Sequence, residues 1–469
     1  MIADSPEQSA RTRTLIVSGD VMGAKMAGPG IRYYHLSRVL SRYTDLTLAI
    51  VPQDRRALKS IQASLPGVKV VGYRIAEWDT LKEHIAGAEV ALASPSTIGY
   101  MPQFLDFDGA LVLDGYDPML AEWVTHPKSD DVEQQVAEWS EYLAELYNQY
   151  LAADFIICAS ERQRFWWFGQ LEVAGRINPL TIGRDNSLRD LVDIVPYGLP
   201  QDPPVHTRPM VKGVWPGIDE DDILLLWGGG LWPWLDSLTA VQAVERLQED
   251  YPNLKLIFPG TIHPNRNVAI SMPVRETATY QYIQEKDLLN KVAFFGEWVP
   301  YEDWQSVLLE CDIALSLHHD TLETQLAFRS RMLEYFWAGL PLVATTGDAT
   351  SELVARYKVG VVVDYEDVDG VGQAIRQILA GDTAFQAGFE RARQDLTWEK
   401  AAEPLIRFCQ NPRRAADRGA EGALGITHHE RKIRELEHLV AAVRSGRFIR
   451  AMKQLDDMRI RWRNWRNRP

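Results

Sequence analysis

Short apolar segments recur along the whole chain, and between them apolar residues appear at three- and four-residue steps. This alternation of strand-like and helix-like patterns is typical of α/β domains with a parallel sheet. Several segments are apolar throughout, which favours strands that helices cover on both faces. The strands predicted in the first half are Thr14–Ser18, Leu46–Val51, Val68–Val71, Glu89–Ala93, Ala110–Asp114, Phe155–Ala159 and Leu191–Val195.

The pattern starts again after Pro196–Pro209, a proline-dense segment typical of a linker between domains. We therefore expect two doubly wound Rossmann-like α/β domains, at residues 14–205 and 206–395, facing a central cleft. A tail at 1–13 precedes them, and a crossover helix at 396–410, a mobile linker at 411–426 and a basic amphipathic helical tail at 427–469 follow. The strands predicted in the second half are Ile223–Trp227, Leu254–Phe258, Val292–Phe295, Ile313–Leu317, Leu342–Ala344 and Val359–Val363.

The richest chemistry lies in the second domain, where the strand Ile313–Leu317 runs into a helical pattern from Leu326 to Gly339. Ligands of open parallel sheets bind outside the carboxyl ends of the strands, where helices begin. A helix start beside Arg329 and Arg331 suits an anion such as a phosphate. The alternative is a pair of surface arginines, since alternate residues of a helix point to different faces.

Around this helix start, Glu323 and Ser330 add polar groups, and Glu334 lies one turn further on. A carboxylate at that point could accept hydrogen bonds from sugar hydroxyls.

In the first domain, Gly28-Pro29-Gly30 opens a helix predicted at about 31–42. Glycines there would let the backbone approach a ligand closely, although an ordinary strand-to-helix loop would look the same. The turn lacks the GxGxxG spacing, so a dinucleotide site is not predicted.

A second loop of this domain joins Asp114, which ends a strand, to Tyr116 and Asp117. Their carboxylates and hydroxyl would stand at the sheet edge where this fold class places its chemistry. Asp117 before Pro118 is also a typical helix cap, and the two roles are compatible.

The second domain offers comparable positions after its first three strands. Gly228, Gly229 and Gly230 could bring backbone N–H groups against a phosphate or a sugar. Trp232 and Trp234 could stack on sugars or bases, or could equally be core residues. After the next two strands come Thr261, followed by His263 and Arg266, and then Glu297-Trp298, where a nucleobase could bind.

Composition narrows the classes of function. With 64 acidic against 50 basic residues, the net charge of −14 argues against a nucleic-acid role for the whole protein. Cys158, Cys311 and Cys409 lack metal-site spacing, which indicates reduced, buried thiols in a cytoplasmic protein. The polar start predicts no signal peptide, and no apolar run is long enough to span a membrane.

The last segment, 444–469, has the opposite character: it is basic and contains Trp462 and Trp465. Such a helix could lie on an anionic membrane surface, so we expect a cytoplasmic protein that could also bind peripherally to the inner face of the membrane. Nucleic-acid binding, a dimer helix pair, or a charged helix docked on the protein itself would look similar.

Taken together, the twin α/β domains, the linker and several local segments resemble the GT-B glycosyltransferases, most closely the retaining, nucleotide-sugar-dependent enzymes of family 4 (group 1). The resemblance covers about residues 14–408 and rests on five landmarks in order. These are Gly28–Gly30, Asp154–Ser160, Val195–Leu199, Val292–Asp312 and Met332–Glu352.

The resemblance implies a transferase that moves a sugar from a nucleotide-diphosphate donor to a glycan or lipid-linked acceptor, in polysaccharide biosynthesis of the cell envelope, without a metal or other cofactor. It implies that Glu334 binds the nucleotide ribose and that Trp398 begins the helix that returns to the first domain. The catalytic candidates are Asp114, Asp117, Arg329 and Arg331. The donor-binding candidates are Gly28, Gly30, Gly229, Gly230, Thr261, Glu297, Glu323, Ser330 and Glu334. The acceptor-side candidates are Tyr116, Trp232 and Trp234.

Two departures from the family pattern keep alternatives open. Leu326 stands where the family has its first glutamate, a role that Glu323 could take over, and the family's Arg/Lys pair after the first strand of the second domain is missing. Arg329, Arg331 or Arg266 could supply the lost charge. The alternatives are a non-catalytic nucleotide-sugar or glycan-binding protein, a nucleotide-sugar epimerase and a phosphorylase-like enzyme, and any of these could act as an oligomer.

Overall fold

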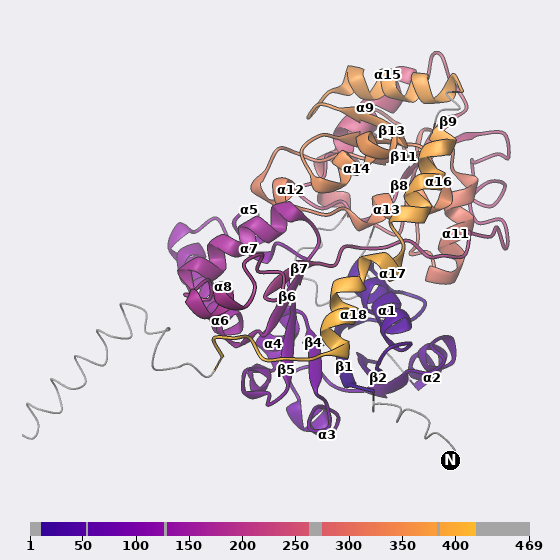
Figure 1. Ribbon diagram of the computed structural model, residues 1–469. Helices are drawn as coiled ribbons and strands as arrows, with labels where there is room; N and C mark the ends of the chain where they lie inside the picture. Colours follow the sequence, from indigo (N-terminus) through magenta and orange to yellow (C-terminus); the bar gives the residue numbers. More distant parts are fainter. Residues whose placement is uncertain (1–10, 53–54, 126–128, 262–273, 382–384, 419–469) are drawn as a thin grey trace, which may run out of the picture.

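The computed structural model describes residues 11–52, 55–125, 129–261, 274–381 and 385–418. These residues form two α/β lobes, one above the other in Figure 1, and each lobe is built on a parallel sheet. We call them the N lobe and the C lobe. The prediction of two doubly wound domains in a GT-B arrangement is confirmed.

The N-lobe sheet has seven strands in the order β3-β2-β1-β4-β5-β6-β7. Because β1 lies between β2 and β4, the strand order reverses beside β1, which is the point where open sheets of this kind bind ligands. The strands are β1 (Arg13–Val21), β2 (Asp45–Val51), β3 (Lys69–Gly72), β4 (Val90–Ala93), β5 (Ala110–Asp114), β6 (Phe155–Cys158) and β7 (Val192–Ile194).

The C-lobe sheet has six strands in the order β10-β9-β8-β11-β12-β13, so its order reverses beside β8 in the same way. Every strand predicted from the apolar runs is present, with its ends displaced by a few residues at most. The strands are β8 (Ile223–Trp227), β9 (Leu254–Pro259), β10 (Ala293–Gly296), β11 (Ile313–Ser316), β12 (Leu342–Thr345) and β13 (Gly360–Val363).

Helices cover both sheets, and buried apolar residues form one cluster that continues from the N lobe into the C lobe and further clusters within each lobe. None of the described helices is long and apolar enough to cross a bilayer. The N-lobe helices are α1 (Gly28–Leu40), α2 (Arg55–Ser64), α3 (Lys82–Ile85), α4 (Pro95–Tyr100), α5 (Met119–Thr125), α6 (Val132–Ala152), α7 (Glu161–Val173) and α8 (Pro179–Arg184). The C-lobe helices are α9 (Ser237–Leu247), α10 (Ala278–Glu285), α11 (Tyr301–Glu310), α12 (Leu322–Leu326), α13 (Ser330–Ala338), α14 (Ala349–Tyr357), α15 (Val368–Leu379) and α16 (Phe385–Asp395).

The helix predicted to run from Leu326 is interrupted. It forms two helices, α12 and α13, with residues 327–329 as a short loop between them. Gly339 ends α13 in the left-handed conformation, with φ of 73°, as its position in the sequence suggested.

After the C lobe the chain returns to the N lobe through α17 (Trp398–Ala401) and α18 (Glu403–Gln410), which Figure 1 shows descending beside α1 and β1. Phe408 stacks on Phe155 of β6, with ring centroids 4.6 Å apart. The expected mobile linker is wrong for residues 411–418, because these residues bind the N lobe. The N–H of Ala415 donates to Asp154 at 2.9 Å, and Asp417 pairs with Arg176 at 2.7 Å.

Candidate active site

A cavity of about 260 Å³ lies between the lobes, at the carboxyl ends of strands from both sheets. The N lobe contributes the start of α1 and the loop after β5, and the C lobe contributes the loops after β8, β9 and β11 and the start of α13. The candidates from the sequence that line it are Gly28, Tyr116, Asp117, Gly229, Gly230, Trp232, Trp234, Thr261, Glu323, Arg329, Ser330 and Arg331. The fold thus brings these twelve residues together around one cavity. Their catalytic and binding roles stay predictions.

The start of α1 faces this cavity without a side-chain cap. A Cβ added to Gly28 would lie 3.4 Å from the Ser330 hydroxyl, so the two lobes meet closely here. Gly30 serves a different purpose, because a Cβ there would lie 2.4 Å from the carbonyl oxygen of Val21. Gly30 therefore lets α1 pack closely on β1 and does not line the cavity, while its expected role in donor binding stays a prediction.

Helix α13 starts at Ser330 on the opposite wall, and its cap residue Arg329 makes no side-chain capping bond. Two helix starts without side-chain caps thus border one cavity. Their unpaired N–H groups and dipoles make this region favourable for an anion.

The aromatic side of the cavity comes from the loop after β8. Trp232 and Trp234 stack with centroids 5.6 Å apart and planes 8° from parallel. Glu297, by contrast, is exposed and does not line the cavity, so its expected place in the donor site stays a prediction. At the predicted nucleobase position a Cβ on Gly296 would lie 2.1 Å from the ring of Trp215, so that indole covers the strand end.

Asp114 is buried and paired rather than placed in the cavity. Its two carboxylate oxygens accept hydrogen bonds from Nε and Nη2 of Arg32, at 2.9 and 3.0 Å. The guanidinium of Arg32 also lies 4.6 Å from the ring centroid of Tyr116. Both members of the ion pair are almost inaccessible to solvent, and Asp114 does not line the cavity. Its expected catalytic role stays a prediction, and the pairing with Arg32 shows that it also supports the structure of the N lobe.

Asp117 does face the cavity, and Glu122 of α5 joins it there. The facing lobe shields Asp117 from bulk water although its side chain is exposed to the cavity. This shielding, with a contribution from the charge of Asp114, raises the pKa of Asp117 to about 7. Burial, and then the charges of Asp117 and Glu323, raise the pKa of Glu122 as well. The N-lobe wall therefore holds two carboxyl groups whose pKa values are both raised above those of free carboxyl groups.

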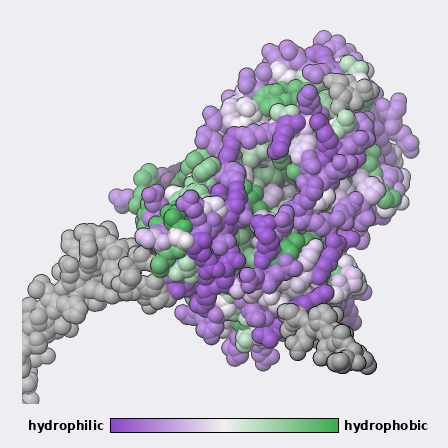
Figure 2. Space-filling view, viewed as in Figure 1, coloured by the Kyte–Doolittle hydropathy of each residue, from purple (hydrophilic) through white to green (hydrophobic). Residues whose placement is uncertain are grey.

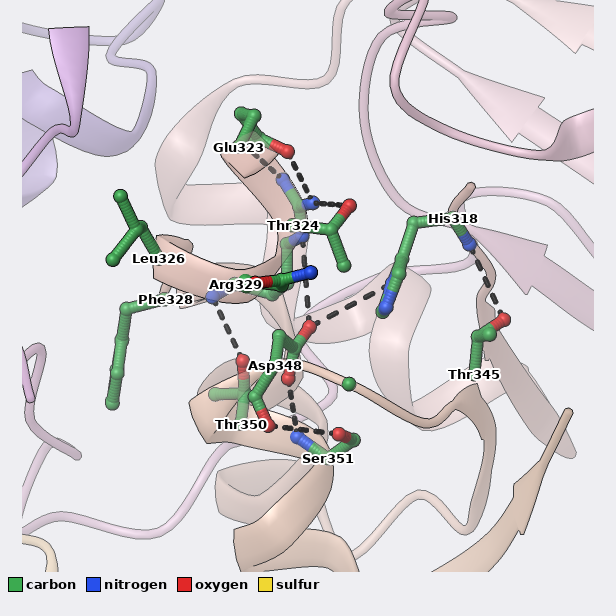
Figure 3. A network of polar contacts seen from close by, with 12 residues as sticks. His318, Glu323, Thr324, Leu326, Phe328, Arg329, Thr345, Asp348, Thr350 and Ser351 are labelled. Carbon is green, nitrogen blue, oxygen red and sulfur yellow. Dashed lines mark hydrogen bonds and ion pairs between the residues drawn. The ribbon is translucent and has the colours of Figure 1, made fainter. Parts of the chain in front are cut away.

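Figure 3 shows how Arg329 is held on the C-lobe wall. Its Nη1 and Nη2 donate to the two carboxylate oxygens of Glu323, both at 2.7 Å, and its backbone N–H donates to Thr350 Oγ1 at 2.9 Å. Asp348 Oδ2 lies 3.7 Å from Arg329 Nε and 3.7 Å from Nδ1 of the buried His318. The charge of Arg329 is thus balanced inside its own lobe, and its expected role in catalysis stays a prediction.

Arg331 and Glu334 are paired in a similar way. The Glu334 carboxylate accepts from Arg331 Nη1 at 2.7 Å, from Trp304 Nε1 at 2.7 Å and from the Tyr197 hydroxyl at 3.1 Å. Glu334 borders a separate cavity of about 120 Å³ beside the linker, not the larger one. Its role as a ribose acceptor stays a prediction that requires a sugar hydroxyl to replace one of these donors.

Other residues of this region were not expected from the sequence: Glu122, Gln163, His318 and Asp348. Nothing in their local sequence pattern marks them, because their partners lie on distant segments.

Among the described residues no group of three or more His, Cys, Asp or Glu side chains could hold a metal ion. Cys158, Cys311 and Cys409 are free and buried, as predicted. Two further candidates, His263 and Arg266, and the basic tail at 427–469 lie outside the described residues.

Comparison with known proteins agrees with this geometry. Residues 216–395 match the family model described as Glycosyl transferases group 1. Sucrose-phosphate synthase from Thermosynechococcus elongatus is similar in structure, with a TM-score of 0.59 and 15% identity over 85% of this chain and 98% of that protein. HepE of Anabaena, in complex with UDP-glucose, is also similar in structure, with a TM-score of 0.55 and 15% identity over 84% of this chain and 98% of that protein.

WaaG, a glycosyltransferase involved in lipopolysaccharide biosynthesis, gives a TM-score of 0.55 and 14% identity over 85% of this chain and all (100%) of that protein. A sequence search of curated proteins finds no match. The family match and the shared architecture agree with the resemblance seen in the sequence. The chain therefore carries a glycosyltransferase domain of group 1 in its C lobe, on a GT-B fold.

Proposed function

We propose that this protein transfers a sugar from a nucleotide-diphosphate sugar to a glycan or lipid-linked acceptor, with retention of the anomeric configuration. The observation that carries the proposal is the interlobe cavity bordered by the uncapped starts of α1 and α13. A diphosphate placed between them would accept hydrogen bonds from both helix starts.

The departing diphosphate gains charge as the glycosidic bond breaks. The two helix dipoles and the arginines beside Ser330 would stabilise that charge where it develops. Loss of one such donor group typically lowers kcat by about a hundredfold or more. This positive potential can replace the metal ion that many other transferases use, so we propose that neither a metal nor another cofactor is needed.

On the opposite wall, Asp117 is suited to accept the proton of the acceptor hydroxyl, because a base is most effective when its pKa lies near the working pH. The stacked pair Trp232–Trp234 offers an aromatic face for a sugar ring.

An acceptor with an apolar portion fits the surface of the N lobe. Figure 2 shows hydrophobic side chains gathered over the part of the lobe built from α5 to α8. The exposed residues there are Val124, Val132, Val136, Phe165, Val173, Leu180 and Ile182. WaaG acts in lipopolysaccharide synthesis, and its similarity supports a role in cell-envelope polysaccharide synthesis at the cytoplasmic face of a membrane.

The test combines binding and product analysis. Isothermal titration with UDP, GDP and ADP identifies the base, and mass spectrometry of reactions with a panel of donors identifies a glycoside product. NMR of the new anomeric centre then decides between retention and inversion. A free epimer of the donor as the only product would show an epimerase instead.

A non-catalytic binding protein is the second candidate, favoured by the pairing of both cavity arginines with carboxylates of their own lobe. Tight nucleotide binding without hydrolysis or transfer of any donor would establish it.

A further inference from the structure

The loop between α12 and α13 is held from both lobes at once. On the N-lobe side, Gln163 Nε2 donates to the carbonyl of Leu326 at 2.8 Å, and the Tyr116 hydroxyl donates to the carbonyl of Phe328 at 2.9 Å. On the C-lobe side, the N–H of Ala327 donates to Thr324 and that of Arg329 to Thr350 Oγ1, at 3.2 and 2.9 Å. Along this loop, backbone carbonyls that accept hydrogen bonds from the N lobe therefore alternate with backbone N–H groups that donate within the C lobe.

The side-chain amide of Gln163 uses all its hydrogen-bonding groups in this arrangement. Its Oε1 accepts the N–H of Ala159 at 2.7 Å, and since a backbone N–H can only donate, this contact fixes which way the amide points. Nε2 then directs its two hydrogens to the carbonyls of Tyr116 and Leu326, both at 2.8 Å. Because Gln163 is 1% exposed, each lost contact would leave a buried polar group unpaired.

Tyr116 is held just as firmly on the N-lobe side. The guanidinium of Arg32 lies over its ring, and Asp114 binds that guanidinium with both oxygens. The ring also meets Phe328 edge to face, with centroids 6.3 Å apart. The buried ion pair therefore fixes the hydroxyl that binds the donor-side loop.

We propose that Gln163 and Tyr116 are positioning residues for sugar transfer, which set the shape of loop 326–329 when the lobes close. The proposal rests on the proposed function. Arg329 and the first turn of α13 face the cavity from this loop, and small displacements of groups that orient a reacting ligand lower rates strongly. A ligand that fits the loop in this shape would in turn favour the closed arrangement.

The kinetic test uses Tyr116→Phe, which removes only the hydroxyl, and Gln163→Met, which keeps the length of the side chain. We expect kcat/KM for the donor to fall roughly threefold to tenfold in Tyr116→Phe and by about tenfold or more in Gln163→Met. Tyr282→Phe on α10 is the matched control, because it removes one tyrosine hydrogen bond, to Glu245 at 2.6 Å, far from the cleft. Unchanged kcat and KM in both cleft variants would overturn the proposal.

A second measurement needs no substrate and separates this proposal from the proposed function. Glu172→Cys and Lys291→Cys place spin labels on exposed positions of the two lobes, and the three native thiols are buried. Pulsed electron spin resonance should give one narrow interlobe distance for the parent protein and a broader distribution for Tyr116→Phe and Gln163→Met.

A role in stability alone would lower the Tm of Gln163→Met and leave the distance distribution unchanged, and that result would overturn the proposal. If no donor is turned over, the proposed function fails, while the distance measurement still decides whether these residues clamp the lobes.

Discussion

Glu323 binds the guanidinium of Arg329 with both of its carboxylate oxygens, at 2.7 Å each, in the wall of the interlobe cavity. The side chain of Glu323 is 2% exposed and that of Arg329 is 12% exposed. Glu323 partly balances the charge of Arg329 and also fixes the position of this guanidinium in the wall of the cavity.

Breaking this pair from one side should be costly. Arg329→Gln leaves a buried, uncompensated carboxylate and should lower the free energy of unfolding by about 3–5 kcal/mol. Glu323→Gln with Arg329→Gln should recover most of that stability without recovering activity, because the cationic group stays absent. Urea unfolding and donor kinetics of the three variants check both parts. Normal turnover in the double variant would remove Arg329 from the reaction.

The Glu334 cluster should affect donor binding more than chemistry. Glu334→Ala leaves Arg331 without its partner and removes the predicted ribose acceptor, so KM for the donor should rise roughly tenfold while kcat changes little. Initial-rate kinetics over a range of donor concentrations measure the two constants separately. A fall in kcat at constant KM would instead place Glu334 in the step that breaks the glycosidic bond.

Asp117 should set the pH dependence of transfer. Its pKa of about 7 means that the base form becomes populated as the pH rises through neutrality, so the rate should climb over that range. Asp117→Asn should flatten this rise and lower kcat by about a hundredfold or more. A pH–rate profile of both proteins is the measurement, and an Asn variant that keeps the parent profile would exclude Asp117 as the base.

Two buried histidines should make the protein sensitive to acid. Burial, with Arg38 adding to it, lowers the pKa of His35 to about 3, and burial with the charge of Arg329 lowers that of His318 to about 3. Because an unfolded histidine has a pKa of about 6.5, the unfolded chain binds more protons between these values, and stability falls as the pH falls through that window. At about pH 5.5 each histidine should cost about 1.2 kcal/mol relative to neutral pH.

Urea unfolding of the parent protein, His35→Gln and His318→Gln at neutral and acidic pH tests this expectation. Each variant should lose less stability on acidification than the parent, even if it is less stable at neutral pH. An equal loss in all three would show that other groups control the acid response.

Gly30 should tolerate no side chain. Gly30→Ala places a Cβ 2.4 Å from the carbonyl of Val21, a backbone atom that cannot rotate away, and should destabilise the protein by about 1–3 kcal/mol. Gly169→Ala in α7 is the control, because open space surrounds that position and alanine is the better helix former. Thermal unfolding should separate the two variants in opposite directions.

The sequence predicted the strands well because several are continuous apolar runs, such as Val90–Ala93 and Phe155–Cys158, that burial on both faces explains. It also located the cavity, since strand ends of parallel sheets meet at one edge whatever the side chains are. The sequence did not predict which side chains pair with each other inside the fold. Asp114 and Arg32 are 82 residues apart, and Tyr197 and Glu334 are 137 apart, so no local pattern could show that these groups neutralise or saturate each other.

The break between α12 and α13 escaped prediction for the same reason. Its apolar spacing reads as one helix, but the bonds from Gln163 and Tyr116 come from the other lobe.

The returning segment has a consequence for how the protein is made. Phe408 completes the apolar packing around Phe155, and Ala415 and Asp417 satisfy polar groups of the same lobe. During synthesis the packing of the N lobe therefore stays incomplete until the C lobe and the returning segment have left the ribosome. The lobe that emerges first is the last to be finished, and the interval between the two events exposes it to chaperones and to aggregation.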